Sequence, residues 1–268
     1  MKLSLSGFLF EDDYASQSVS FERFCEIAAS AGYEGVELRR TQITMEAPAQ
    51  RRSELLRIAR DAGLAITCLT VRYSPKTQPQ RDAYFLRHLQ LCADLECGLL
   101  KTGGDPAWRE QMAERALEFG VTLASNNHVG SQRETVAGTR QFFAESPHAN
   151  YGLLYDSMHL RVSGEDYVGC IEEFYPRVRN ILMHSLRPAE RDEDGAMEIS
   201  GRYWNRALPD AEGVQDWPAI FRAFRRLGYD GLVTVIEAGW PSEQREDIAR
   251  RCARTLKDLW LEAGPGAE

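Results

Sequence analysis

The sequence predicts a single-domain α/β protein with the (β/α)8, or TIM-barrel, architecture. One observation is a repeated change of hydrophobic period, in which short apolar runs of β type alternate with longer runs of helical spacing. A second is that the β-type runs begin about every 30 residues, the length of one strand-plus-helix unit. The third is the length of 268 residues, which suits eight such units in a closed ring.

Eight strands are expected, each an apolar run bounded by glycine or polar residues. They lie at 3–8, 35–38, 65–71, 98–102, 121–126, 151–155, 180–184 and 231–237. The last interval is longer because a polar segment is inserted at about 188–216, and its charge run at 190–194 indicates a solvated loop or lid. We therefore expect one barrel domain over 1–262 that carries this inserted loop, followed by a flexible tail at 263–268.

Amphipathic helices are expected between the strands, because apolar residues recur there at three- and four-residue spacing. Glycine supplies the left-handed turn that closes a helix. Several of the expected helices end at such a glycine just before the next strand: Gly32, Gly63, Gly120 and Gly228. An open doubly wound sheet is the competing fold, but it needs a glycine-rich phosphate turn that the first strand does not provide.

The charge balance of 32 basic and 40 acidic residues gives −8. An acidic surface repels phosphate backbones and anionic lipid, so nucleic acid and membranes are not expected as partners. No run of 18 apolar residues predicts a membrane-spanning helix, and the first ten residues do not read as a secretory signal. The six cysteines form no CxxC pair, which predicts reduced, mostly buried thiols and a cytoplasmic protein.

Polar side chains stand at the carboxyl ends of five predicted strands, where barrels of this type carry their chemistry. A carboxylate at the end of an apolar strand is costly to desolvate unless it is paired or bound to a cation. Asp156, His184 and Glu237 come from three consecutive strands, so their side chains are expected to converge. Two carboxylates and an imidazole suit Mn²⁺, Mg²⁺, Co²⁺ or Zn²⁺. A buried salt-bridge cluster is the alternative that spacing leaves open.

The order of these motifs resembles the xylose isomerase-like barrel superfamily over nearly the whole chain. The superfamily includes sugar-phosphate isomerases and epimerases, ketose 3-epimerases, hydroxypyruvate isomerase, inosose dehydratase and endonuclease IV relatives. The motifs that carry the resemblance are GYEGVEL at 32–38, Asn127-His128, the Asp-x-x-His of Asp156 and His159, the strand-end His184, and LGYDG at 227–231 leading to Glu237.

In the superfamily, one divalent metal is held by Glu, Asp, His and Glu from four successive strands. The resemblance implies that Asp156, His184 and Glu237 are ligands, with Mn²⁺ the first expectation. The first glutamate is replaced by Asn126, whose amide oxygen still coordinates a hard cation but takes no proton. In the epimerase members the two glutamates are the acid–base pair, so only Glu237 remains here.

The resemblance implies an isomerase, epimerase or lyase that acts on a small sugar, sugar phosphate or keto-polyol. The metal would polarise the substrate and stabilise an enediolate-like charge, with Glu237 as the base. Because dehydration needs one base, Asn126 shifts the expectation from epimerase toward dehydratase chemistry. For a two-base reaction, Lys101, Glu37 and His128 are the candidates for the group opposite Glu237.

Further residues near the strand ends are expected to contact the substrate. The family position of His159 implies a catalytic role, beside the metal or on a substrate hydroxyl. Arg187 is expected to replace the cation that the family places after the seventh strand, and Arg39 is a candidate phosphate contact. Aromatic rings in this region are candidates for a sugar platform: Phe8, Phe10, Tyr73, Trp240, Tyr203 and Trp204.

Two other functions are weighed against catalysis on a sugar. Asn126 keeps open a degenerate, non-catalytic or accessory sugar-binding barrel that needs a partner subunit. An abasic-site endonuclease needs three metals, many more ligands and a basic face, so five histidines and a charge of −8 argue against it. Related barrels often pair through their helical sides, which implies a homodimer.

Overall fold

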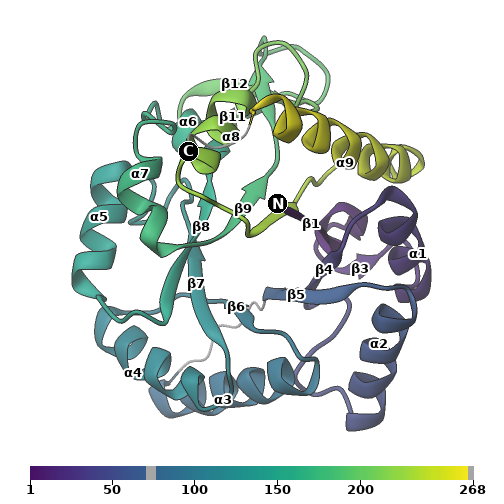
Figure 1. The fold of residues 1–268 in the computed structure, drawn as a ribbon, viewed down its shortest axis with the longest axis vertical. Coiled ribbons are helices and arrows are strands. Elements are labelled where there is room, and N and C mark those ends of the chain that lie inside the picture. The colour runs from purple at the N-terminus through teal and green to yellow at the C-terminus, as the bar shows by residue number, and fades with distance from the viewer. Residues whose placement is uncertain (71–76, 265–268) are drawn as a thin grey trace.

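The structure, a computed structural model, describes residues 1–70 and 77–264. Eight parallel strands pair in the order β1-β13-β9-β8-β7-β6-β5-β4, and β1 also pairs with β4, which closes the ring. Helices surround this ring on its outer side (Figure 1). The prediction of a single (β/α)8 barrel is therefore confirmed.

The strands of the barrel are short, from three residues in the shortest to six residues in the longest. They are β1 (Lys2–Ser6), β4 (Gly35–Arg39), β5 (Ala65–Thr70), β6 (Leu99–Lys101), β7 (Thr122–Asn126), β8 (Tyr151–Asp156), β9 (Val178–Met183) and β13 (Leu232–Val235). Each predicted strand has a counterpart within a few residues. The last residue of the predicted third strand, Val71, lies outside the described residues.

The predicted first strand is too long at its end. Its last two residues belong to the 3-10 helix η1 (Gly7–Phe10) instead. The Ser6 side chain starts this turn because its hydroxyl accepts a hydrogen bond of 3.2 Å from the Phe8 N–H. A small hairpin of β2 (Glu11–Asp12) and β3 (Ser16–Gln17) follows.

Helices lie in the connections between barrel strands and after the last strand. They are α1 (Phe21–Ala31), α2 (Ala49–Asp61), α3 (Gln78–Asp94), α4 (Pro106–Leu117), α5 (Val136–Glu145), α6 (Ser157–Val162), α7 (Ile171–Phe174), α8 (Trp217–Arg226) and α9 (Arg245–Glu262). The connection from β8 to β9 holds two short helices, α6 and α7, and then the 3-10 turn η2 (Tyr175–Arg177). A third 3-10 turn, η3 (Ser242–Gln244), precedes α9.

Glycine closes helices as predicted. Gly32 ends α1 with φ at 81°, and its N–H bonds to the carbonyls of Ala28 and Ala29. The other three glycines expected at helix ends also have positive φ: Gly63, Gly120 and Gly228. The left-handed turn lets each of these helices pass directly into the next barrel strand.

The barrel interior is layered. One apolar layer takes a side chain from each of five neighbouring strands and one from the residue after β13: Cys68, Leu99, Ala124, Leu154, Leu182 and Ile236. Nearer the strand starts, Asn180 and Thr234 exchange two hydrogen bonds of 2.8 and 3.1 Å. The apolar layer thus forms the floor under the polar strand ends, and the larger core lies between strands and helices.

The segment expected as an inserted loop contains an antiparallel sheet. Its strands β10 (Leu186–Pro188), β12 (Arg202–Arg206) and β11 (Met197–Ile199) pair in that order. Trp204 is buried, and it packs with Leu186 and with Met158 and Val162 of α6. The insert is therefore anchored on the helix that follows β8.

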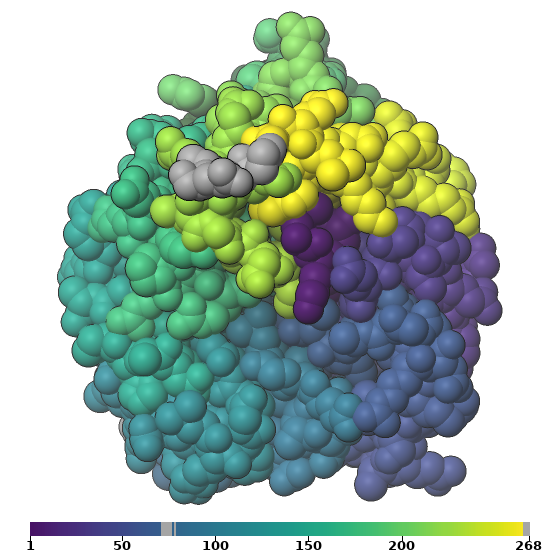
Figure 2. Space-filling view, viewed as in Figure 1, coloured from purple at the N-terminus to yellow at the C-terminus, as the bar shows by residue number. Residues whose placement is uncertain are grey.

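The chain begins near the middle of the face turned to the viewer in Figure 2, where the purple residues lie, so this is the face at which the parallel strands start. The green insert projects beyond the ring at the top of the same view. All six cysteines are buried and free of disulfides, as predicted. Among residues 1–70 and 77–264, no helix has the length and apolar character needed to cross a membrane.

Candidate metal and substrate site

Asp156 forms the centre of the candidate site. Every residue of β8 is buried, and Asp156 at its end is 0 % exposed. Its carboxylate also caps α6, because Oδ1 accepts a hydrogen bond of 3.4 Å from the His159 N–H. One residue thus ends a barrel strand, starts a helix and places an acid at the carboxyl end of the barrel.

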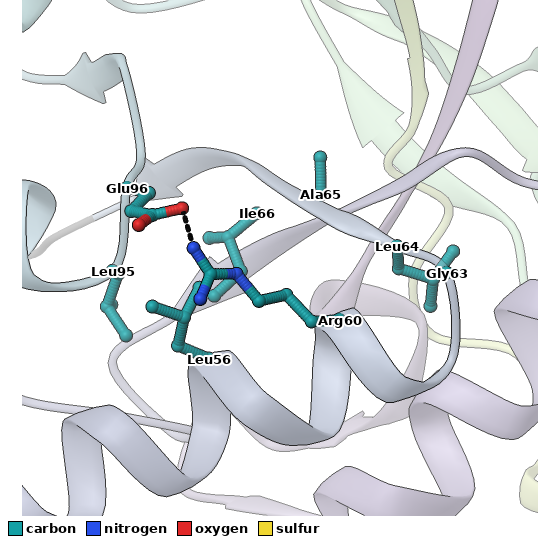
Figure 3. Close-up of a pocket in the computed structure, with 8 residues that line it drawn as sticks. All are labelled: Leu56, Arg60, Gly63, Leu64, Ala65, Ile66, Leu95 and Glu96. Carbon is teal, nitrogen blue, oxygen red and sulfur yellow. Dashed lines mark hydrogen bonds and ion pairs between the residues drawn. The ribbon is translucent and has the colours of Figure 1, made fainter.

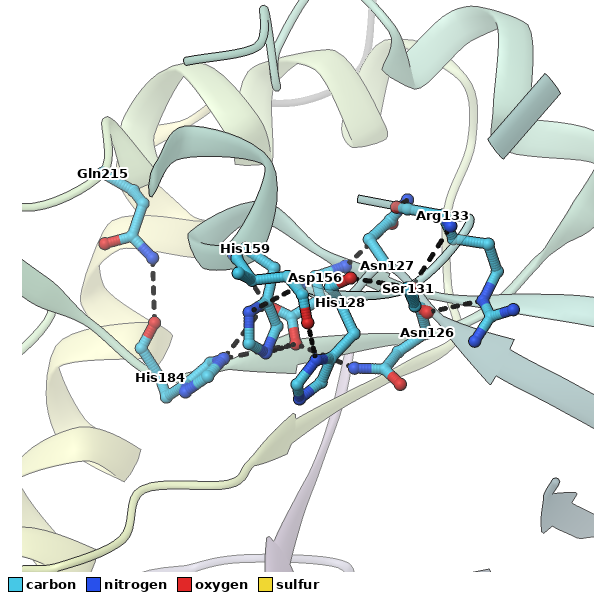
Figure 4. Close-up of polar contacts among 10 residues, drawn as sticks. Asn126, Asn127, His128, Ser131, Arg133, Asp156, His159, His184 and Gln215 are labelled. Carbon is cyan, nitrogen blue, oxygen red and sulfur yellow. Dashed lines mark hydrogen bonds and ion pairs between the residues drawn. The ribbon is translucent and has the colours of Figure 1, made fainter. Parts of the chain in front are cut away.

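Two imidazoles face this carboxylate. His184 Nε2 lies 3.0 Å from Oδ1 and 3.2 Å from Oδ2 of Asp156. His159 Nε2 lies 3.7 Å from Oδ2. One potential ligand atom from each of the three residues falls within 4.8 Å of the others (Figure 4).

The charges of this cluster depend on one another. Burial opposes ionisation of Asp156, but the adjacent His184 and His159 outweigh burial and lower the pKa of its carboxyl. Burial lowers the pKa of His159 to about 3. For His184, burial is outweighed by Asp156, so the pKa is raised. His159 therefore offers a neutral ring nitrogen, and Asp156 an anionic oxygen.

This donor set fits a divalent metal ion. Asp156 supplies a hard oxygen, and His159 and His184 supply the nitrogens that transition ions prefer. A fully buried carboxylate that faces two imidazoles and forms no ion pair with a lysine or arginine of the described residues is also an environment in which a bound cation compensates the desolvation of the acid. The predicted convergence of Asp156 and His184 is present, and His159 joins them.

Asn126 lies beside the cluster at the end of β7. Its Nδ2 donates a hydrogen bond of 3.4 Å to Oδ2 of Asp156, so the NH₂ side of the amide, not the carbonyl oxygen, faces the acid. Its backbone carbonyl accepts from Arg133 Nε at 2.9 Å. A turn of the amide about its last side-chain bond would exchange oxygen and nitrogen. The neighbouring Asn127 has a structural place, since it donates to Thr139 at 2.7 Å.

Glu237 is buried after β13 but is not part of the Asp156–His159–His184 group. Its Oε1 accepts a hydrogen bond of 2.9 Å from the Ser185 N–H, and its Oε2 accepts one of 2.9 Å from Trp240 Nε1. Burial raises the pKa of this carboxyl, although these donors and His184 oppose the shift. Trp240, expected as a sugar platform, thus has a polar contact that sequence reasoning missed. The spacing of three residues between Trp240 and Glu237 was the feature of the sequence that could have suggested this hydrogen bond.

Lys101 and Glu37 stand elsewhere on the strand ends. Lys101 ends β6, the fourth strand from β13 in the ring of eight, and therefore on the opposite side of the barrel. Within the described parts of the chain, its ammonium group forms no ion pair or hydrogen bond, although its charge acts on Asp156. Glu37 is buried on β4, where its Oε1 accepts from Ser6 at 2.9 Å and Thr70 at 3.2 Å.

His128 extends the cluster toward solvent. Its ring lies 4.0 Å from that of His159 at an interplanar angle of 34°, and the rings of His159 and His184 are 5.3 Å apart. His128 is exposed, whereas the other two rings are partly buried. Gln215 donates to the His184 carbonyl at 2.9 Å, a contact that sequence reasoning did not predict because Gln215 lies in the insert.

Two predicted cations are paired with acids. Arg187 forms an ion pair with Glu193 in the insert, and Arg39 Nε lies 2.9 Å from Oε1 of Glu11. Each has its charge balanced by a neighbouring side chain, so neither is an uncompensated cation in this structure.

The predicted aromatic platform is only partly in reach of a ligand. Phe10 is 1 % exposed and Trp204 is 4 % exposed, so both rings are enclosed by the protein. Phe8 packs against the apolar layer of the barrel interior, and Arg39 lies 4.0 Å over its ring. Tyr73 lies outside the described residues.

A cavity of about 290 Å³ lies away from these strand ends, between α2 and the start of β5 (Figure 3). It is lined by apolar side chains and by the ion pair of Arg60 and Glu96. None of the predicted site residues lines it. Because α/β barrels carry their chemistry at the opposite ends of the strands, we assign the site to the Asp156 cluster.

Curated relatives of this chain are named inosose dehydratase. The protein from Lacticaseibacillus casei is 26% identical over 129 residues, which covers 47% of this chain and 43% of that protein. The protein from Geobacillus thermodenitrificans is 26% identical over 151 residues, covering 55% and 49%. The matched region thus spans about half the length of these relatives.

Solved structures match nearly the whole chain. One, described as the probable 3-DHS dehydratase AsbF of Bacillus anthracis, has a TM-score of 0.75 and 18% identity, covering 96% of this chain and 99% of that one. A D-psicose 3-epimerase has a TM-score of 0.75 and 15% identity, covering 97% and 99%. At these identities the likeness establishes the fold. The model of the xylose isomerase-like TIM barrel family matches residues 25–259, and the chain therefore belongs to this family.

Proposed function

We propose that the protein is a divalent-metal-dependent lyase that dehydrates a small keto-polyol. The observation that carries the proposal is the buried Asp156 with His159 and His184 at the strand ends, beside an amide at Asn126. The charges of two carboxylates, Asp156 and Glu237, act on His184. Glu237, a buried acid outside the group of Asp156, His159 and His184, supplies the single base that dehydration needs.

Asp156, His184 and His159 would hold the metal, and Asn126 and Glu237 are the further ligands predicted from the sequence. When bound, a divalent cation supplies Lewis-acid polarisation of a carbonyl or hydroxyl oxygen. Mn²⁺ remains the first expectation, with Mg²⁺, Co²⁺ or Zn²⁺ as alternatives. The mixed oxygen and nitrogen donors favour a transition ion over Mg²⁺.

Glu237 takes the proton from the carbon next to the substrate carbonyl. Its two oxygens are oriented by the Ser185 N–H and by Trp240, which is the geometry a positioned base requires. The bond from the next carbon to its hydroxyl then breaks. Lys101, whose ammonium group forms no direct ion pair among the described residues, donates a proton to the departing hydroxide, which leaves as water. Solvent returns the proton from Glu237 to Lys101.

Epimerisation is the second candidate, and the position of Lys101 favours it. Lys101 stands on the strand opposite β13, so a substrate bound between Lys101 and Glu237 presents one face to each. Proton removal on one face and return on the other would invert the carbon between them. The likeness in fold to a D-psicose 3-epimerase supports keeping this reaction in the test.

The experiment incubates the Mn²⁺-loaded protein in D₂O with an inosose and with ketohexoses and follows the products by NMR. Dehydration gives the signals of an unsaturated or rearranged ketone, and epimerisation gives a deuterated isomer. Glu237→Gln is expected to reduce turnover by about a thousandfold or more, because it removes the base. Glu243→Gln, an exposed acid near the same loop, is the matched control.

Absence of turnover together with absence of metal binding would contradict the proposal and favour the accessory, non-catalytic barrel. The cytoplasmic location, the homodimer and the barrel domain at 1–262 with its tail remain predictions, the last four tail residues lying outside the described part. Light scattering coupled to size-exclusion chromatography tests the dimer.

A further inference from the structure

Arg206 lies between the two turns that carry His184 and Glu237. It ends β12, where it pairs in register with Leu186, and the following Ala207 N–H donates to the Ser185 carbonyl at 3.2 Å. Its guanidinium reaches the other turn, because Nε donates to the Ala238 carbonyl at 2.7 Å. The charge of Arg206 acts on Glu237, which directly precedes Ala238. The insert thus delivers a cation to the edge of the candidate site.

Gly239 makes room for this guanidinium. A Cβ atom on Gly239 would lie 2.3 Å from Nη2 and 2.6 Å from Cζ of Arg206, closer than real Cβ contacts. Gly239 also has φ at 70°, a conformation that other residues rarely adopt. The guanidinium therefore rests directly on the backbone after Glu237, in a place that a side chain at residue 239 would fill.

Among the described residues, Glu237 is the acid on which the charge of Arg206 acts, and the two side chains form no direct ion pair. Within the part of the chain that the structure describes, the guanidinium of Arg206 makes one hydrogen bond, through Nε, so the two terminal nitrogens keep their N–H groups for a ligand. Arg187, which lies on the adjacent strand, is instead neutralised by Glu193. A partly buried guanidinium with free terminal donors is suited to a two-pronged contact with a carboxylate or phosphate.

The rest of the site also favours an anion. Lys101 adds a second cation, which acts on Asp156 through its charge but forms no direct ion pair among the described residues, and Asn126 contributes an uncharged amide beside Asp156. We propose that Arg206 binds an anionic substituent of the substrate, so that the site takes an acidic or phosphorylated polyol in preference to a neutral sugar. This inference rests on the proposed function, whose substrate class it narrows.

The test measures binding by calorimetry to the full-length protein with and without Mn²⁺. The probes are D-fructose, D-fructose 6-phosphate and D-gluconate, which share a six-carbon polyol and differ in charge. Wild type is expected to bind one anionic probe at least about tenfold more tightly than D-fructose. Tighter binding of D-fructose 6-phosphate would identify the anionic group as a phosphate, and tighter binding of D-gluconate would identify it as a carboxylate.

Arg206→Gln is expected to weaken the preferred anionic probe by about thirtyfold while D-fructose binding changes less than about twofold. Arg206→Lys keeps the charge but loses the paired N–H donors of the guanidinium, so it should retain part of the preference for the anionic probe. Gly239→Ala should reduce this preference by displacing the guanidinium. Arg202→Gln, an exposed arginine at the other end of β12, is the matched control. Thermal melts establish that each variant is folded.

Equal affinity of wild type for all three probes would overturn the inference, as would an equal loss for D-fructose in Arg206→Gln. If Arg206→Gln does not fold, Arg206→Lys and Gly239→Ala replace it in the test. A preference for the anionic probe that equals that of wild type in both variants would then overturn the inference. The proposed function fails separately: an intact, Arg206-dependent preference without turnover of any polyol would leave the anion site and remove the lyase. Turnover of neutral keto-polyols without any preference for anionic probes would support the lyase and exclude the anion site.

Discussion

The indole N–H of Trp240 donates a hydrogen bond of 2.9 Å to Oε2 of Glu237, three residues earlier. With the Ser185 N–H at 2.9 Å from Oε1, each oxygen of this buried carboxylate is held by an uncharged donor. Uncharged donors orient a carboxylate without neutralising it as an arginine would. The arrangement fixes the direction of Glu237 and preserves its capacity to accept a proton.

Replacing this indole tests its orienting role. Trp240→Phe keeps an aromatic ring but removes the donor to Oε2, so we expect kcat to fall about tenfold while KM changes less than about twofold. Steady-state kinetics on the substrate found by NMR measure both constants. Trp260→Phe, on α9, is the control and should leave kcat unchanged. Equal kcat values for Trp240→Phe and wild type would show that the backbone donor alone orients Glu237.

Metal binding is expected to depend on Asp156. Mn²⁺ at a hundred times its Kd stabilises a folded protein by about 2.7 kcal/mol, which raises Tm by several degrees in a chain of this size. Asp156→Asn removes the anionic ligand and should abolish the shift in differential scanning fluorimetry. Asp247→Asn, an exposed acid on α9, should keep it. A full Mn²⁺ shift in Asp156→Asn would place the metal elsewhere.

The barrel and the centre of the site were predictable because they rest on local, periodic signals. Each strand is an apolar run, and a parallel ring brings the residues after such runs to one end. Asp156 ends β8 and His184 directly follows the adjacent β9, so their meeting at 3.0 Å follows from topology. His159 lies on α6 one turn after Asp156, and the helix brings its ring back to the carboxylate.

The contacts made by the insert could not be predicted. Arg187 was expected in the site, but the chain folds back into the sheet of β10 to β12 and brings Glu193 to its guanidinium. The same sheet carries Arg206 to the loop after Glu237, 32 residues further along the chain. The insert has no apolar periodicity of barrel type, so pairings between such distant segments leave no signal in its sequence.

Arg109 is expected to contribute strongly to stability. It is 2 % exposed, donates to Ser146 Oγ and to the Gly104 carbonyl at 2.7 Å each, and stacks 3.8 Å over Phe142. Arg109→Ala leaves buried acceptors unpaired, so the free energy of unfolding should fall by about 3 kcal/mol in urea titrations. Arg115→Ala, which breaks only an exposed pair with Glu118, should change it by less than about 1 kcal/mol.

The thiols are expected to be unreactive in the folded protein. Burial raises the pKa of Cys25 and of Cys170 to about 12. A raised pKa keeps a thiol protonated at pH 8, and the thiolate is the reactive form. Ellman's reagent at pH 8 should therefore label none of the six cysteines in the native protein within minutes, and all six in urea. Rapid labelling of native Cys25 or Cys170 would contradict the burial of that thiol.

Asn126→Asp is expected to separate the effects of charge on the free and the metal-bound protein. The new carboxylate would stand where Nδ2 now lies 3.4 Å from Asp156, and two buried carboxylates repel each other. Without metal, the free energy of unfolding should fall by about 1–2 kcal/mol. With Mn²⁺, the added anionic oxygen becomes a ligand, so affinity should rise about tenfold and the Tm shift should exceed that of wild type.

Asn150→Asp supplies the control for that experiment. Asn150 is an amide whose Nδ2 donates to the Ala113 and Val121 carbonyls at 2.9 and 2.8 Å, remote from the metal cluster. The aspartate lacks these donors, so this variant should also lose stability, but its Mn²⁺ shift should equal that of wild type. An equal loss in Asn126→Asp with and without Mn²⁺, measured by fluorimetry and by calorimetric titration, would exclude residue 126 from the coordination of the metal.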